Sequence, residues 1–69
     1  MPKRYSSREI IKLIEADGWC LIMAKGSHHQ FSHNTKSGRV TIPHPKKDID
    51  VKTAHSIFKQ AGIKKQEEK

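Results

Sequence analysis

The fold is decided by residues 18–33, which read GWCLIMAKGSHHQFSH. The apolar-rich run at 19–24 lies between two glycines and is too short for a helix, so it predicts a strand. Lys25-Gly26 is a turn signal, and residues 27–33 follow as a second extended run. Two such runs joined by a short turn predict an antiparallel pair of strands.

Amphipathic helices are predicted on both sides of this pair. Ser6 followed by Glu9 fits a capping box, and the apolar residues behind it recur at helical spacing, which predicts a helix over 7–17. Asp50 serves as the N-cap of a second helix over 50–61, which carries an apolar stripe of its own.

A third strand completes the predicted sheet. Residues 39–42 alternate polar and apolar side chains, and Pro43 and Pro45 end the run because neither can donate to a ladder of hydrogen bonds. The element order is therefore αβββα. We expect an α+β fold in which a three-stranded antiparallel sheet carries two helices on one face.

The composition describes a small basic protein. Its 69 residues make one domain, 1–69, with a core over about 5–63 and a charged tail at 64–69. Lysine and arginine number 14 against 7 Asp and Glu, which gives a formal charge of +7. So high a charge on so small a domain is expected of a nucleic-acid binder or of a partner for an acidic protein.

The cysteine content and the amino end indicate the compartment. A single cysteine, Cys20, excludes an internal disulfide and fits a reducing environment. It lies inside the first strand with no base beside it, so we expect a buried small residue rather than a nucleophile. The basic amino end has no apolar run behind it, which predicts neither a signal peptide nor a membrane span and favours a cytoplasmic protein.

Strand alternation separates the adjacent histidines of the second strand. If Phe31 packs beneath the helices, His29 lies on the same side, whereas His28 and Gln30 point to the open face. Arg39 joins that face from the third strand, which makes it polar and basic. Because the unperturbed pKa of histidine lies near neutrality, His28 is the candidate for proton transfer, and we expect His29 to be structural.

Five histidines raise the question of a metal site, and their spacing argues against one. His28 and His29 face opposite sides of a strand, while His29 and His33 lie about 13 Å apart at roughly 3.3 Å per residue. Zinc requires ligands within about 2.1 Å of one ion. His28 paired with His44, on the loop between two prolines, lacks a third ligand, so we expect no metal and no cofactor.

Several short motifs run in one order through nearly the whole chain. Gly18-Trp19 is followed by KGSHHQF at 25–31, TIPHPKKDI at 41–49 and KQAGI at 59–63. Together they closely resemble the HicA toxins. The resemblance implies a fold similar to a double-stranded RNA-binding domain, which has the element order predicted above.

The resemblance also implies a function. HicA-like proteins are mRNA interferases, toxins that cleave RNA and arrest growth, and a HicB antitoxin encoded beside them blocks the active site. The family's catalytic histidine, the first after the Gly-Ser pair, corresponds to His28, and a second family histidine corresponds to His44, expected here to reach the open face and support catalysis. We expect RNA and a HicB-type antitoxin as partners, no membrane partner, and no DNA contact for the toxin alone.

Metal-independent RNA cleavage is within the chemical reach of such a site. RNA carries its own nucleophile, the 2′-OH, so His28 need only remove that proton or protonate the leaving 5′ oxygen. Basic side chains stabilise the charge that develops on the phosphate, and the expected products are a 2′,3′-cyclic phosphate and a 5′-hydroxyl. The residues expected to contact RNA are Lys25, Gly26, Ser27, Gln30, Arg39, Lys46 and Lys47.

Two other interpretations stay open on the sequence alone. A non-catalytic RNA-binding module of the same fold would present the same basic face, and it would bind RNA in EDTA without cleaving it. A basic domain whose only partner is an acidic protein would show no salt-sensitive RNA binding.

The first strand predicts a surface for the antitoxin. Simple alternation gives it two apolar faces, with Trp19, Leu21 and Met23 on one and Cys20, Ile22 and Ala24 on the other. Only one face can lie against the helices, so the other is left for a partner to cover.

Overall fold

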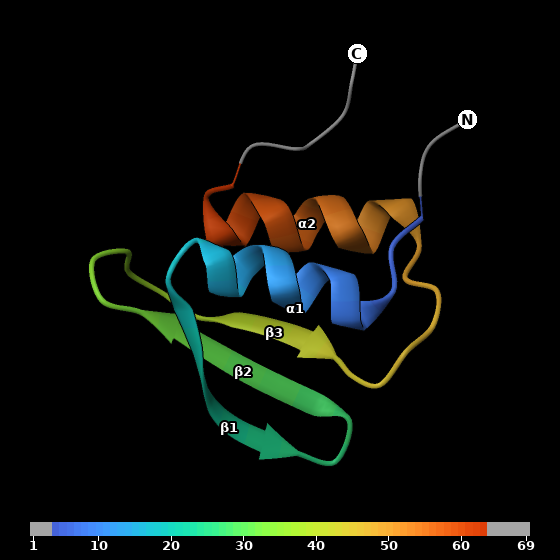
Figure 1. Ribbon diagram of the computed structural model, residues 1–69, viewed down its shortest axis with the longest axis horizontal. Helices are drawn as coiled ribbons and strands as arrows, with labels where there is room; N and C mark the ends of the chain where they lie inside the picture. Colours follow the sequence, from blue (N-terminus) through green and yellow to red (C-terminus); the bar gives the residue numbers. More distant parts are fainter. Residues whose placement is uncertain (1–3, 64–69) are drawn as a thin grey trace.

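Two helices cover one face of a three-stranded antiparallel sheet, as Figure 1 shows for the computed structural model. The structure describes residues 4–63, so the tail predicted at 64–69 lies outside the described residues. The predicted α+β class and its αβββα order are confirmed. The elements are α1 (Ser7–Ala16), β1 (Trp19–Lys25), β2 (His28–His33), β3 (Val40–Pro43) and α2 (Val51–Ala61).

The helix ends follow the capping residues. The Ser6 side chain accepts a hydrogen bond from the Glu9 backbone N–H at 3.1 Å, and the Glu9 carboxylate accepts one from the Ser6 N–H at 3.0 Å, which completes the predicted capping box. α1 ends at Ala16, one residue earlier than predicted. α2 has Asp50 at its N-cap and Gly62, with a left-handed φ of 67°, at its C-cap.

The strands differ from the predicted ranges by one residue, at one end of β1 and of β2 and at both ends of β3. β1 extends to Lys25, and β2 begins only at His28. β3 runs one residue later than 39–42, so Pro43 closes the strand instead of following it. The sheet order is β1-β2-β3, and β3 is therefore an edge strand, where a proline can be accommodated.

The core lies between the helices and the inner face of β2 and β3. Trp19, at the start of β1, joins it, and its indole N–H donates to the Ala61 carbonyl oxygen at 3.2 Å. The buried apolar residues are Ile10, Ile14, Trp19, Phe31, Val40, Ile42, Ile49, Ala54, Ile57, Phe58 and Ala61.

A β-bulge changes the faces of β1. Leu21 pairs with Phe31 and Met23 pairs with Gln30, so Ile22 has no partner on β2. Since paired residues share a face, Met23 lies on the open face with Gln30. Simple alternation, which grouped Met23 with Leu21, is wrong beyond the bulge.

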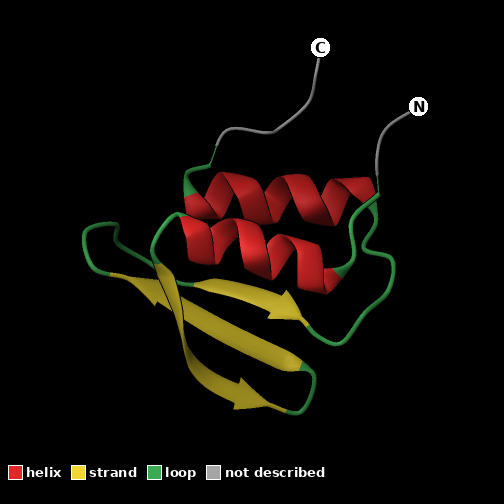
Figure 2. Ribbon diagram, in the orientation of Figure 1, coloured by secondary structure: helices red, strands yellow, loops and turns green. Residues whose placement is uncertain are grey.

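β1 lies at the far side of the sheet from the helices (Figure 2). Only Trp19 of this strand is buried, and the side chains of Leu21, Ile22 and Met23 are each about half exposed, at 49%, 47% and 49%. Cys20 is exposed as well, so the expectation of a buried cysteine is wrong. The reason is that Cys20 pairs with Ser32 and therefore lies on the open face of the sheet, opposite the helices.

Candidate functional site

His28 is the first residue of β2, directly after the glycine turn. Its side chain is exposed, and it pairs with Lys25 on β1 and with Pro43 on β3. Within residues 4–63 the His28 ring has no hydrogen-bond or ion-pair partner. Both of its ring nitrogens are therefore available to a substrate.

The open face beside His28 carries polar and basic groups, as strand alternation predicted. Gln30 lies two residues further along β2 and pairs with Thr41 on β3. Arg39 donates from Nη1 to Gln30 Oε1 at 3.4 Å, which is a long contact between exposed groups. Lys25, His28, Gln30 and Arg39 thus form one group, which we call the open-face group.

The turn before His28 is tied to the loop that follows β3. Gly26 has a φ of 59°, the left-handed conformation that suits glycine in a tight turn. The Ser27 carbonyl oxygen then accepts a hydrogen bond from the His44 backbone N–H at 2.8 Å. Ser27 and His44 are therefore cross-strand neighbours one step beyond the His28–Pro43 pair.

The ring of His44 lies on the helix side of the sheet rather than on the open face. It meets the ring of His29 edge to face, with centroids 5.1 Å apart and an interplanar angle of 89°. Its Nδ1 is 2.6 Å from Ser7 Oγ. The expectation that His44 reaches the open face is wrong, because alternation turns it to the side opposite His28.

Ser7 holds this histidine and is a residue that sequence reasoning missed. It is the first residue of α1, and only 1% of it is exposed. Besides its contact with His44, Ser7 Oγ accepts from the Lys46 backbone N–H at 2.9 Å, and the Ser7 N–H donates to the Lys46 carbonyl oxygen at 2.8 Å. Ser6 alone is enough to cap the helix, so the presence of a second serine hinted at another role for Ser7. No local sequence pattern, however, links residue 7 to residue 44.

A pocket of about 540 Å³ opens beside the first turn of α1. His44 lines it together with the exposed basic residues Arg8, Lys46 and Lys47. Sequence reasoning did not select Arg8. Two of the residues predicted to contact RNA, Lys46 and Lys47, therefore lie here and not in the open-face group. The structure divides the predicted basic surface into two parts.

Comparison with known proteins identifies the family. The model of the HicA toxin of bacterial toxin–antitoxin systems matches residues 7–63. The chain belongs to the HicA toxin family. A solved structure described as a toxin–antitoxin complex from Streptococcus pneumoniae contains a similar chain, with a TM-score of 0.70 and 30% sequence identity over 84% of this chain and 97% of that one. A comparison with curated protein sequences gave no match.

His29 occupies an unusual position for the structural role expected of it. In this HicA-family chain its ring is half-buried against His44, and its Nδ1 is buried with no hydrogen-bond partner among the described residues. A buried polar atom left unpaired carries a desolvation cost. The two histidines and Ser7 therefore form one polar cluster on the helix side of the sheet, near the N-terminal end of β2.

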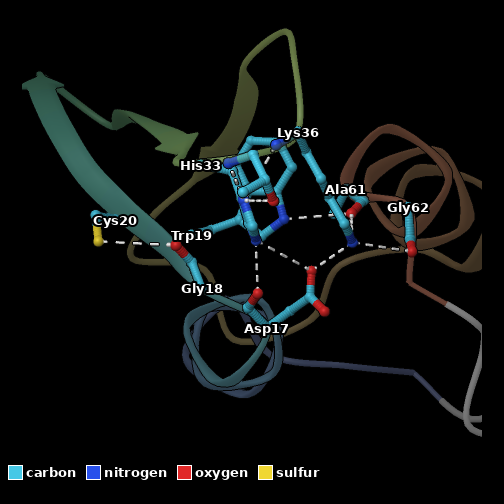
Figure 3. A network of polar contacts seen from close by, with 9 residues as sticks. Asp17, Gly18, Trp19, Cys20, His33, Lys36, Ala61 and Gly62 are labelled. Carbon is cyan, nitrogen blue, oxygen red and sulfur yellow. Dashed lines mark hydrogen bonds and ion pairs between the residues drawn. The ribbon is translucent and has the colours of Figure 1, made fainter.

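A second polar cluster, at the other end of β2, is structural (Figure 3). His33 donates from Nε2 to the Asp17 carbonyl oxygen at 2.7 Å, while its Nδ1 accepts the backbone N–H groups of Thr35 at 3.0 Å and Lys36 at 3.2 Å. Both ring nitrogens are occupied in holding the β2–β3 loop to the end of α1. His33 is thus unavailable for chemistry.

Lys36 belongs to the same structural cluster. Its Nζ donates to Asp17 Oδ2 at 2.6 Å and to the carbonyl oxygens of Ala61 at 3.0 Å and Gly62 at 3.2 Å, so it neutralises the C-terminal end of α2. The hydrogen bond from Lys36 lowers the pKa of the Asp17 carboxyl below its ordinary value. Lys36 therefore stabilises the fold, and we do not count it among the basic residues that contact RNA.

Within residues 4–63, no set of three or more His, Cys, Asp or Glu side chains is arranged to hold a metal ion. Neither α1 nor α2 is long and apolar enough to cross a membrane.

Proposed function

We propose that this HicA-family protein is a toxin ribonuclease that cleaves RNA with His28 as a general acid or base, and that a HicB-type antitoxin neutralises it. The observation that carries the proposal is the exposed imidazole of His28, which has no side-chain partner among residues 4–63 and is set at the start of β2 opposite Lys25. Membership of the HicA family over residues 7–63 supports the activity class. The cytoplasm, where mRNA is found, is the proposed site of action.

The His28 ring is suited to proton transfer by its freedom. A general base must reach the 2′-OH of the substrate within about 2.6–3.2 Å, so its nitrogens cannot be occupied by the protein. His28 meets this condition and His33 does not. A positioned imidazole contributes about 10²–10⁴-fold to a rate.

The proposed RNA contacts follow the two basic surfaces. Lys25 and Arg39 of the open-face group are placed to stabilise negative charge that develops on a phosphate near His28. Lys46 and Lys47, beside the pocket at α1, are placed to hold the RNA backbone further along. Gly26 and Ser27 carry small side chains, so the RNA backbone can approach the turn before His28 closely.

The proposed antitoxin surface is β1. It is an edge strand with three consecutive half-exposed apolar residues, Leu21, Ile22 and Met23. The outer backbone N–H and C=O groups of an edge strand have no neighbouring strand, so a partner chain can pair with them and cover the apolar side chains. The similar solved chain was determined in a toxin–antitoxin complex, which supports an antitoxin as that partner.

The test compares RNA cleavage by the wild-type chain and by His28→Ala in EDTA, with His55→Ala, an exposed histidine of α2, as the matched control. We expect His28→Ala to lose cleavage and growth arrest while its thermal unfolding stays unchanged, and the product ends of the wild-type reaction to be a 2′,3′-cyclic phosphate and a 5′-hydroxyl. Unchanged cleavage by His28→Ala would overturn the catalytic assignment.

The same assay separates the alternatives. A folded wild-type chain that binds RNA but leaves it intact is the non-catalytic RNA-binding module. A chain without salt-sensitive RNA binding is a partner for an acidic protein.

A further inference from the structure

We propose that Ser7 is a positioning residue that holds His44 as the tautomer with its proton on Nε2. In this form His44 donates a hydrogen bond to a phosphate oxygen of an RNA strand bound in the pocket beside α1. The proposal rests on the proposed function, because it takes RNA as the ligand. It adds a second contact site, on the side of the sheet opposite His28.

The hydrogen bonds of Ser7 Oγ determine the tautomer. A serine hydroxyl has one proton to donate, and Ser7 Oγ already accepts from the Lys46 N–H at 2.9 Å. His44 Nδ1, at 2.6 Å, is the remaining partner of this oxygen among the described residues. If Nδ1 carried a proton, Ser7 Oγ would accept twice and its own proton would have no acceptor among residues 4–63, although only 1% of Ser7 is exposed to water. The hydroxyl therefore donates to Nδ1, and the proton of the neutral ring is on Nε2.

Backbone hydrogen bonds also hold the His44 ring in position. The His44 N–H is bonded to the Ser27 carbonyl oxygen at 2.8 Å, and Ser7 and Lys46 exchange backbone and side-chain bonds on the other side. The ring also packs edge to face against His29. His44 is thus held on three sides, which reduces the ordering cost of using it to bind a ligand.

The surroundings of His44 select an anion. The pocket that it lines also carries Arg8, Lys46 and Lys47, all exposed, and no acidic residue lines it. An Nε2–H donor with three cations around it matches a phosphodiester, whose oxygens only accept hydrogen bonds. A base with a free Nε2 lone pair would instead repel the phosphate oxygen, so the tautomer matters to binding.

The first experiment reads the tautomer and the contact by NMR of the ¹⁵N-labelled full chain, at a pH where the histidines are neutral. We expect His44 Nδ1 to be unprotonated and hydrogen-bonded. We also expect the His44 Nε2–H signal to shift when a 2′-O-methylated oligoribonucleotide, which lacks the nucleophile, is added. A proton on Nδ1 in the wild-type chain, or no shift with the oligonucleotide, would overturn the proposal.

The second experiment uses variants. Ser7→Ala removes the hydroxyl, Ser7→Thr retains it, and Ser6→Ala removes the N-cap of the same helix without touching His44. We expect Ser7→Ala to lower kcat/KM for RNA cleavage by about 10- to 100-fold, as the loss of a partner that orients a metal-bound histidine does. Ser7→Thr should restore most of the activity. Equal activities of Ser7→Ala and Ser6→Ala would refute the positioning role.

A third pair of variants keeps the test decisive if Ser7→Ala does not fold. His44→Gln places an amide N–H near the position of Nε2–H, and His44→Asn places one near Nδ1, so only His44→Gln should retain the wild-type affinity for the oligonucleotide. The NMR readouts do not depend on cleavage. A wild-type chain that shows the His44 shift but cleaves nothing therefore contradicts the proposed ribonuclease and leaves the His44 contact established.

Discussion

Gly18→Ala tests the structural cluster at the end of α1. Gly18 has a φ of 107°, and a Cβ built on it would lie 2.7 Å from His33 Nε2. Left-handed backbone costs a non-glycine residue about 1–3 kcal/mol. The clash also displaces a ring that donates to Asp17, and the loss of one such hydrogen bond costs about 0.5–1.5 kcal/mol. We therefore expect Gly18→Ala to lower the free energy of unfolding by about 2–4 kcal/mol.

The chain offers a matched control at Gly38. Its φ is 85°, and nothing lies within 4 Å of a Cβ built there, so Gly38→Ala incurs the backbone strain without the clash. One kcal/mol shifts Tm by about 4–8 °C in a domain of this size. The lost hydrogen bond of about 0.5–1.5 kcal/mol should therefore make Gly18→Ala melt about 2–12 °C below Gly38→Ala in thermal unfolding. In a His33→Ala background the two glycine substitutions should cost the same. Equal losses of stability in the wild-type background would refute the role given to His33.

Two further predictions concern acid stability and the antitoxin. The pKa of Asp17 is lowered in the folded state, mainly by its hydrogen bond from Lys36, so the stabilisation is present above the ordinary Asp pKa and is lost as the pH falls through the lowered folded value. Lys36→Met should flatten the decline of Tm with falling pH, and an unchanged pH profile would contradict this. Ile22→Glu puts a charge on the exposed bulge of β1 and should weaken antitoxin binding at least 10-fold in calorimetry, with RNA cleavage retained. Full antitoxin affinity in that variant would move the interface off β1.

Most of the fold was predictable because local signals agreed with one another. The Ser6–Glu9 box, the N-cap residue Asp50 and the two apolar stripes all set boundaries that the structure reproduces within a residue. The bulge at Ile22 was not predictable from alternation. Residues 19–24 are nearly all apolar, so the sequence shows no break in a polar–apolar pattern where the extra residue lies. The consequence of the bulge was an error in the face assigned to Met23, whereas Cys20 lies before the bulge and is exposed because it shares the open face with Ser32.

The orientation of His28, on β2, was predictable from the sequence, but the orientation of His44, on the loop after β3, was not. The open-face placement of His28 follows from its alternation with Phe31, which the core fixes. His44 lies outside regular structure, and its orientation depends on Ser7, which is 37 positions away in the sequence. Lys36 shows the same limit, since charge alone could not reveal that it caps α2. Long-range polar contacts of this kind depend on the packing of whole elements.

The bulge in β1 joins the proposed antitoxin surface to the proposed catalytic face. By turning Met23 to the side of Gln30, it places an exposed apolar side chain on the face that carries His28 and Lys25. A partner that covers the apolar side chains of β1, Met23 included, would reach onto the polar face that also carries His28. We infer that antitoxin and RNA compete for this face, so an antitoxin need not contact the imidazole to exclude the substrate. The pocket at His44, on the other side of the sheet, would stay open to a phosphate in such a complex.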